Sequence, residues 1–480
     1  MSSSTTPDPF AAAGAGRFRA RLRTAAVWLF IATLAWSPFP LGGAIAWASD
    51  LQEILIAVCW MLWVASSIAS SQKAWPENRA VLVPLILAVL ALGWACLQML
   101  PIVPAAWAHP AWAMASEGLG RPIRGVISLN PWRTEGEILK LSSYLMAGWL
   151  VYRLARREDT AAVLLDAIIA IGTAYAVYAL ALSLADTYQT RVFYTVPSGN
   201  TYISGPFMLH NSFATYAGLV AVAATVKLFA KGNDYIVSGR GLKQMTLTVV
   251  RYCFGRGAPA LVAALLTFSG VVASASRAGF ASMMCGLTAV ALASLLVNHR
   301  SASRYWAAAG ALAAALPLFV FILLSGDTLS SRIDQLFDSG TAGEIRLALW
   351  ESARHMIADA PWLGLGLGTF PDAYPLYATR VLPFVMDKAH CDYLEFAAGI
   401  GLPAAAAWWT AMIWTVALCL RGVRVRRRHR LYPLIAVGAS VLVAAHSAVD
   451  FSLQLPAVAL LYAALLGLGL SQALPTRNNL

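Results

Sequence analysis

His390 has the surroundings expected of a general base. It lies in residues 386–391, where a long polar segment gives way to an apolar one. Asp387 is the expected N-cap of the helix that follows, which puts His390 in the first helical turn. Because a helix N-terminus attracts anions and favours a neutral imidazole, His390 could take a proton from a hydroxyl while a phosphate departs. The alternative is an interfacial histidine that only caps its helix.

Three arginines are candidates for binding that anion. Arg277 lies in a short turn between two apolar segments, with no carboxylate nearby in the sequence. An unpaired cation at a membrane boundary is costly, so we expect Arg277 to face a polar cavity or an anion, unless it only snorkels to the interface. Arg191 and Arg346 are further candidates on the same side. Arg346 could instead pair with Glu344 or Glu351 on its own helix.

Two polar clusters and one tyrosine are secondary candidates. His210 and Asn211 open an apolar segment, and His446 and Asp450 lie at the turn between two others. Each cluster could also be an ordinary polar helix end. Tyr393 follows the His390 segment. No two of the histidines share a helix at ligand spacing, so we expect no catalytic metal.

The glycines of residues 361–370 resemble a nucleotide-binding loop only superficially. They follow no predicted strand and lack the lysine of a phosphate-binding loop. We therefore interpret them as a tight turn resting on the membrane, and we expect no nucleotide or other cofactor.

The composition indicates an all-α membrane protein. Of the 480 residues, 59% are hydrophobic and 12% charged, about half the charged fraction of a soluble domain. The apolar residues form long blocks, which predict about twelve transmembrane helices. The expected spans cover residues 24–48, 51–70, 80–101, 138–152, 160–185, 209–230, 258–276, 279–298, 305–324, 391–420, 431–449 and 453–472. Pro38 and Pro40 interrupt the first span, which we expect to be retained as an anchor rather than cleaved as a signal peptide.

The net charge of +12 has a topological explanation. Most Lys and Arg residues lie in alternate loops, as the positive-inside rule requires when both termini are cytoplasmic, so nucleic acid is not needed as a partner. Residues 1–23 and 473–480 are then cytoplasmic tails, and residues 24–324 hold nine spans with a periplasmic loop at 102–137. Residues 325–390 form a large periplasmic loop, expected to be a helical cap, and residues 391–472 hold the last three spans. The six cysteines form no C-x-x-C pair and suggest no redox chemistry.

Several of these segments together resemble the bacterial O-antigen ligase and polymerase superfamily, whose members move undecaprenyl-pyrophosphate-linked glycans in the periplasm. The similarity spans roughly residues 200–455. It rests on the segments 206–211, 274–279 and 361–370, on the helix of Arg346, and on His390 followed by Tyr-Leu-Glu at 393–395 and glycines at 399 and 401. The departure is Cys391, where ligases typically have Asn, Ser or Gln.

The resemblance implies an inverting glycosyltransferase of the GT-C fold type in the bacterial inner membrane, independent of metal and nucleotide. Its arginines would hold the donor pyrophosphate, His390 would deprotonate or orient the acceptor hydroxyl, and the lipid tail would lie between helices open to membrane lipids. The leading expectation is ligation of an O-antigen-like glycan to lipid A-core. A polysaccharide polymerase and a protein O-oligosaccharyltransferase are alternatives that differ in the acceptor. A polysaccharide transporter is an alternative of another class.

Overall fold

The computed structural model describes residues 9–68, 79–184, 203–233, 242–295, 341–380, 386–426 and 428–474, and these ranges contain helices and no strands. The helices are α1 (Pro9–Trp36), α2 (Ala46–Ile68), α3 (Leu82–Met99), α4 (Ala111–Leu119), α5 (Pro131–Leu154), α6 (Glu158–Leu184), α7 (His210–Asn233), α8 (Leu242–Cys253), α9 (Ala258–Ala273), α10 (Arg277–Leu295), α13 (Thr341–Asp359), α14 (Phe370–Tyr377), α15 (Asp392–Ile400), α16 (Leu402–Val425), α17 (Leu431–Ser447) and α18 (Pro456–Ala473). Short 3-10 turns include η1 (Leu41–Gly43), η2 (Arg79–Val81), η3 (Ala105–Trp107) and η4 (Ser452–Gln454). The predicted all-α class is confirmed.

Many of these helices suit a membrane. Seven of those described are long and apolar enough to cross one, namely α2, α3, α6, α7, α10, α16 and α18. The bent pair α8–α9, with 77° between its halves, would make an eighth span, and α17 is a shorter apolar helix. The protein is therefore polytopic, while the count of twelve stays a prediction. The expected span at 305–324 lies outside the described residues.

The centre of the bundle is formed by α7 and α18, because 78% and 89% of their most apolar stretches are buried inside the protein. Small residues let the helices around them approach closely. A Cβ on Gly467 of α18 would collide with the carbonyl oxygen of Gly148 on α5, and one on Gly286 of α10 would lie 2.6 Å from the carbonyl oxygen of Gly438 on α17. Such contacts replace hydrophobic attraction as the source of helix association in lipid.

Two predicted spans are interrupted in the structure. The first ends with α1 at Trp36, and the chain passes through η1 before α2, as the prolines at 38 and 40 predict. The expected span at 391–420 is a correction, because it consists of the nine-residue α15 and the longer α16. Gly401 separates them with a φ of +76°, and a Cβ there would lie 2.5 Å from the carbonyl oxygen of Trp362. A break of this kind needs glycine.

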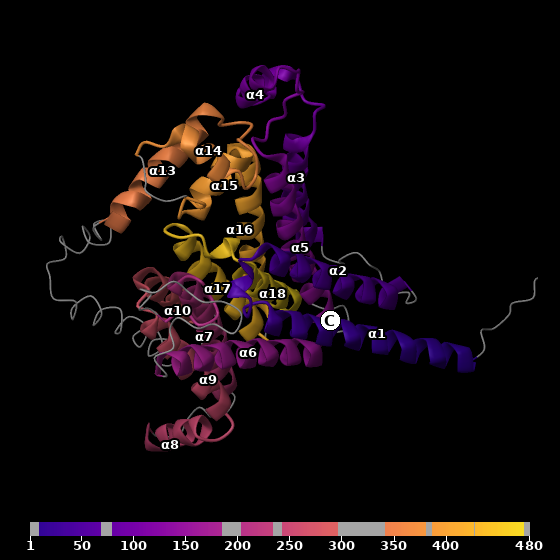
Figure 1. Cartoon of the computed structure of the whole chain (residues 1–480). Coiled ribbons are helices and arrows are strands. Elements are labelled where there is room, and N and C mark those ends of the chain that lie inside the picture. The colour runs from indigo at the N-terminus through magenta and orange to yellow at the C-terminus, as the bar shows by residue number, and fades with distance from the viewer. Residues whose placement is uncertain are drawn as a thin grey trace, which may run out of the picture.

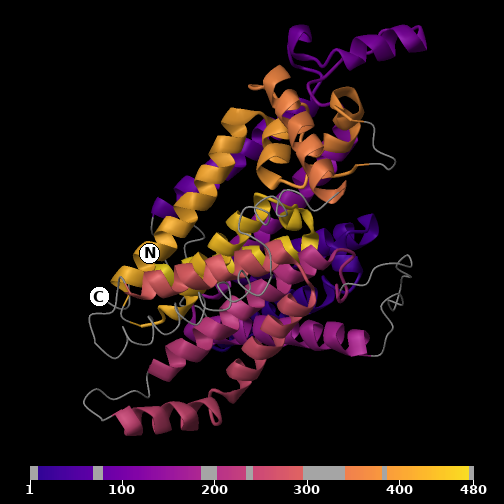
Figure 2. The ribbon, with the colours of Figure 1, turned by 90° about the vertical axis from the view of Figure 1, so that its left-hand side faces the viewer.

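Helices α13, α14 and α15 form a small cap at one end of the bundle, on the side of α4 and opposite α8 (Figures 1 and 2). Leu349, Ala353 and Met356 of α13 pack on Phe370 and Tyr374 of α14 in a separate apolar cluster. The sequence predicts a helical cap in residues 325–390, and the described residues of this segment include the helices α13 and α14, as expected.

The glycine turn at 361–369 fastens the cap to the bundle. The backbone N–H of Leu365 donates to the carbonyl of Ala398, and that of Gly366 to the carbonyl of Gly399, both at 2.9 Å. The Gln98 side chain of α3 donates to the carbonyls of Leu363 at 2.6 Å and Gly399 at 2.9 Å. The tight turn expected from the sequence is present, and its role is to hold the start of α16 and the end of α15.

Candidate active site

His390 lies just before α15 and not in its first turn, which corrects the sequence-based expectation. The N-cap of α15 is Cys391, whose side chain makes no capping hydrogen bond, so Asp387 does not cap this helix. His390 itself has a φ of +53°, in the left-handed region that a residue with a side chain seldom occupies. Such a conformation persists only when neighbouring contacts hold it, and it occurs often at functional sites.

The His390 side chain contacts Asp450 from the turn between α17 and η4. Its Nδ1 lies 3.4 Å from Oδ1 of Asp450, and the imidazole meets the Phe451 ring edge-on with 4.8 Å between centroids. The Trp350 indole of α13 donates to the His390 carbonyl at 3.2 Å. Because Nδ1 faces a carboxylate, Nε2 is the nitrogen available to accept a proton. The 3.4 Å contact is longer than an ordinary hydrogen bond and can tighten when substrate binds.

The surroundings of Asp450 favour its ionised form. Its side chain is 1% exposed, and its Oδ1 accepts the Phe451 backbone N–H at 2.8 Å. Burial by itself would raise the pKa of Asp450, but the hydrogen bond and charge of His390, the nearby His446 and the Phe451 N–H together bring it well below its usual range. An ionised Asp450 can orient His390 and stabilise its protonated form.

A hydrogen-bond network joins this pair to the turn that carries Arg277. Ser452 Oγ lies 3.2 Å from His446 Nδ1 and accepts from Thr215 of α7 at 3.1 Å. At the start of α7, His210 Nδ1 lies 2.9 Å from the carbonyl oxygen of Ser274.

The turn between α9 and α10 is fixed by the next residue of α7. Asn211 accepts a hydrogen bond from Ser276 at 2.7 Å, and Ala275 between the two serines has a φ of +54°. The secondary candidates His210, Asn211, His446 and Asp450 therefore belong to one connected region. His210 and Asn211 contact the turn before Arg277, whereas Asp450 contacts His390 and His446 acts on Asp450 by its charge.

The structure describes two of the three candidate arginines, Arg277 and Arg346. Neither forms an ion pair with a carboxylate within the described residues. Arg277 is the first residue of α10 and is exposed, while Arg346 of α13 is half-buried. Glu344, one expected partner of Arg346, pairs with Arg380 at 2.7 Å instead. The charge of Arg346 acts on both His210 and His446. Arg191 lies outside the described residues.

Tyr393 is used for packing. Its hydroxyl donates to the carbonyl of Ala444 at 2.9 Å, and its ring contacts that of Trp409 with 4.8 Å between centroids. This secondary candidate therefore links α15 to α16 and α17. Among the residues of the described ranges, no group of three or more His, Cys, Asp or Glu could hold a metal ion.

Comparison with known families identifies the part of the chain that carries this site. Residues 262–409 match the family model described as O-antigen ligase. Because of this similarity, the stretch is named the O-antigen ligase domain. The resemblance noted in the sequence is thereby confirmed, and it points to a ligase- or polymerase-type function in glycan biosynthesis at a membrane. A search of curated proteins found no match.

The O-antigen ligase domain contains Arg277, Arg346 and His390, but not Asp450, which contacts His390, or His210, which contacts the turn before Arg277. Asp450 and His446 follow the matched stretch, and His210 precedes it. The site is therefore completed by helices on both sides of the domain.

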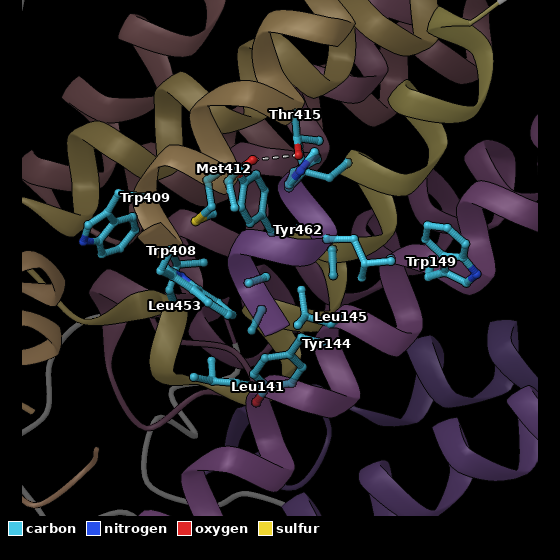
Figure 3. Close-up of a pocket in the computed structure, with 18 of the residues that line it drawn as sticks. Leu141, Tyr144, Leu145, Trp149, Trp408, Trp409, Met412, Thr415, Leu453 and Tyr462 are labelled. Atoms are coloured by element: carbon cyan, nitrogen blue, oxygen red, sulfur yellow. Dashed lines mark hydrogen bonds between the residues drawn. The ribbon is translucent and has the colours of Figure 1, made fainter. Parts of the chain in front are cut away.

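An elongated apolar pocket adjoins the O-antigen ligase domain (Figure 3). It has a volume of about 250 Å³ and lies among α3, α5, α16 and α18. Its lining on α5 runs from Glu137 to Tyr152, about 22 Å along the helix axis. Figure 3 shows Leu141, Tyr144, Leu145 and Trp149 of α5 on one wall and Trp408, Trp409, Met412 and Thr415 of α16 on another; Leu453 and Tyr462 are also labelled.

One end of the pocket is polar and touches the segment that follows His390. Glu137, Asp392, Glu395 and Gln454 line it. Asp392 accepts hydrogen bonds from Ser447 at 2.7 Å and Gln454 at 3.0 Å. Burial raises the pKa of Asp392 to about 7.

Sequence reasoning missed Asp392, Glu395 and Trp350. The two carboxylates stand in the Asp-Tyr-Leu-Glu segment that begins two residues after the histidine, and this closeness was the available signal. Trp350 acts only through a backbone carbonyl, so neither its type nor its spacing marked it.

Proposed function

We propose that the protein transfers a glycan from undecaprenyl pyrophosphate to an acceptor hydroxyl on the periplasmic face, and that the acceptor is lipid A-core in lipopolysaccharide biosynthesis. The observation that carries this proposal is the contact between the buried Asp450 and His390, which belongs to a domain that also contains two arginines without described carboxylate partners. A base and an anion-binding group are what glycan transfer from a diphosphate requires.

The proposed reaction is a single displacement with inversion. The acceptor oxygen attacks the anomeric carbon of the donor sugar and forms the new glycosidic bond. The bond from that carbon to the diphosphate oxygen breaks, and its electron pair leaves with undecaprenyl pyrophosphate. The acceptor proton passes to Nε2 of His390, whose positive charge is balanced by Asp450. Because the leaving group is a diphosphate, the step consumes no nucleotide.

The leaving diphosphate would be stabilised by Arg277 and Arg346. The planar guanidinium matches two phosphate oxygens at once, and its charge offsets the charge that develops on the leaving oxygen. Glu344 is already engaged by Arg380, which leaves Arg346 available for an anion. Arg277 follows a turn that two side chains of α7 hold in place.

The first isoprene units of the donor's hydrocarbon chain would occupy the pocket among α3, α5, α16 and α18, and the rest of the chain would lie among membrane lipids. The apolar lining suits such a segment, and the polar end of the pocket lies beside the loop of His390. Arg421 and Arg424 lie near the far end of α16 from α15. This distribution supports a periplasmic location for the cap, since basic residues favour the cytoplasmic side.

Purified protein in detergent tests the proposal directly. With lipid-linked glycan and lipid A-core, and with neither nucleotide nor metal added, it should form the ligated product. His390→Ala should abolish turnover, whereas His355→Ala, which removes an exposed histidine of α13, should leave it unchanged. Full turnover by His390→Ala would refute the catalytic assignment.

Deletion of the gene distinguishes the acceptors. Loss of a ligase leaves long lipid-linked chains and bare lipid A-core, as we expect here. Single capped repeat units would indicate a polymerase instead, and a mobility shift of a glycoprotein would indicate transfer to protein. Either of these results would overturn lipid A-core as the acceptor.

A further inference from the structure

The loop that carries His390, residues 386–391, is fastened by a second carboxylate besides Asp450. Glu395 of α15 accepts the backbone N–H of Ala389 at 2.7 Å, and Lys388 Nζ lies 3.7 Å from the other oxygen of Glu395. The Glu395 side chain is 7% exposed. A buried carboxylate bonded to the backbone of a loop constrains that loop far more than a surface contact does.

The two bonds to this loop enclose the strained residue. Glu395 fixes the N–H of Ala389, and Trp350 fixes the carbonyl of His390. The backbone between these groups carries the left-handed conformation of His390, which is unfavourable for a residue other than glycine. The conformation therefore depends on both contacts, one from α15 and one from α13.

Lys388 links the same loop to the N-terminal half of the chain. Burial alone would lower the pKa of Lys388, but the charges of Glu395 and of Glu137 on α5 outweigh it and raise the pKa. Glu137 also pairs with Lys140 at 2.9 Å. The lysine is thus held as a cation between two carboxylates from distant parts of the sequence.

We propose that Glu395 is a positioning residue for the transfer reaction: it holds the 386–391 loop so that Nδ1 of His390 stays on Asp450 and Nε2 meets the acceptor hydroxyl. The inference rests on the proposed function for its chemistry. Glu395 itself touches no reacting atom. Without its hydrogen bond the strained loop relaxes, and fewer molecules have the histidine aligned for proton transfer.

Substitution of Glu395 tests the proposal by its effect on turnover. Glu395→Ala should lower kcat by about 10- to 100-fold, because the lost contact aligns the base. Glu395→Gln should keep kcat within about 5-fold, since its amide oxygen still accepts the Ala389 N–H. Glu53→Ala, which removes a half-buried glutamate bonded to Ser49 in its own helix, is the matched control and should leave kcat unchanged.

The thiol of Cys391 reports the loop without any substrate. It is buried in the folded protein, with 6% of its surface exposed. Alkylation of the peptide that contains Cys391, followed by mass spectrometry, should be at least about 10-fold faster in Glu395→Ala than in the wild type, and unchanged in Glu395→Gln and Glu53→Ala. If Glu395→Ala fails to fold, Glu395→Asp is the substitute, because its shorter side chain cannot reach Ala389.

The proposal is overturned if the variant that loses the bond keeps wild-type kcat, if it loses kcat while Cys391 stays protected, or if Glu395→Gln is as impaired as Glu395→Ala. The labelling result is separate from the function proposed above. If the wild type makes no product from lipid-linked glycan, that function fails, while the exposure of Cys391 still decides whether Glu395 holds the loop.

Discussion

Replacement of Asp450 by Asn removes one charge from the site with little change of shape. The amide oxygen can still accept the Phe451 N–H that Oδ1 accepts at 2.8 Å. What disappears is the negative charge 3.4 Å from Nδ1 of His390. The protonated histidine that forms as the acceptor hydroxyl loses its proton is then uncompensated, so the transition state is destabilised more than the bound substrate.

The size of the effect follows from the geometry. Two unit charges 3.4 Å apart interact by about 5 kcal/mol at an effective dielectric constant of 20, which is an upper bound. The His390 side chain is 27% exposed, so water screens part of this interaction, and a charged hydrogen bond is typically worth about 1.5–3 kcal/mol. At 1.36 kcal/mol per factor of ten, kcat should fall by about 10- to 150-fold.

Initial rates measured over a range of donor and acceptor concentrations separate this effect from binding. The donor KM should stay within about 2-fold, because Asp450 does not contact the diphosphate in the proposed arrangement. Asp387→Asn, which neutralises an exposed carboxylate three residues before His390, is the matched control and should retain full activity. Wild-type kcat in Asp450→Asn would show that the carboxylate does not support the base, and the reasoning from the 3.4 Å contact would be wrong.

Three further substitutions have definite expected outcomes. Gly467→Ala should lower the unfolding free energy in detergent by about 1–3 kcal/mol, measured by thermal melting, because its Cβ has no space beside Gly148. Arg346→Gln should raise the donor KM about 10-fold with a smaller change in kcat, whereas Arg354→Gln, at an exposed position of the same helix, should leave the donor KM unaffected. Since the pKa of Asp392 in the fold is about 7, above its ordinary 3.8, stability should decline as the pH rises from about 4 to 7, and Asp392→Asn should flatten the melting temperature over that window.

The fold was largely predictable because apolar periodicity and span length decide helices in a membrane. The expected spans at 431–449 and 453–472 coincide closely with α17 and α18, which cover Leu431–Ser447 and Pro456–Ala473. The break at Gly401 was not predicted, since residues on both sides are apolar and hydropathy averages over them. Only the close approach of the Trp362 carbonyl shows why the helix stops there.

Residue types in the site were easier to predict than their contacts. His390 and Asp450 were both named from the sequence, but their pairing depends on how α15 meets the turn after α17. Asp387 was assigned as an N-cap from local pattern, and that assignment is wrong because the chain continues through a left-handed residue before α15 begins. Local capping rules do not account for a bond that spans six residues, such as that of Glu395 to Ala389.

The recognisable site residues lie in the matched stretch, and the first half of the chain could therefore be recognised only as generic spans. The O-antigen ligase domain supplies His390 and the two described arginines, and their types and spacing are visible in the sequence. The residues around them act through single buried contacts. Glu137 on α5 influences Lys388 by its charge, and Asp450 meets one ring nitrogen. Each such contact requires one carboxylate at one position and leaves no repeated pattern in the sequence. Alignment of the base therefore depends on the whole bundle. Substitutions outside the matched stretch should change kcat as strongly as many substitutions within it.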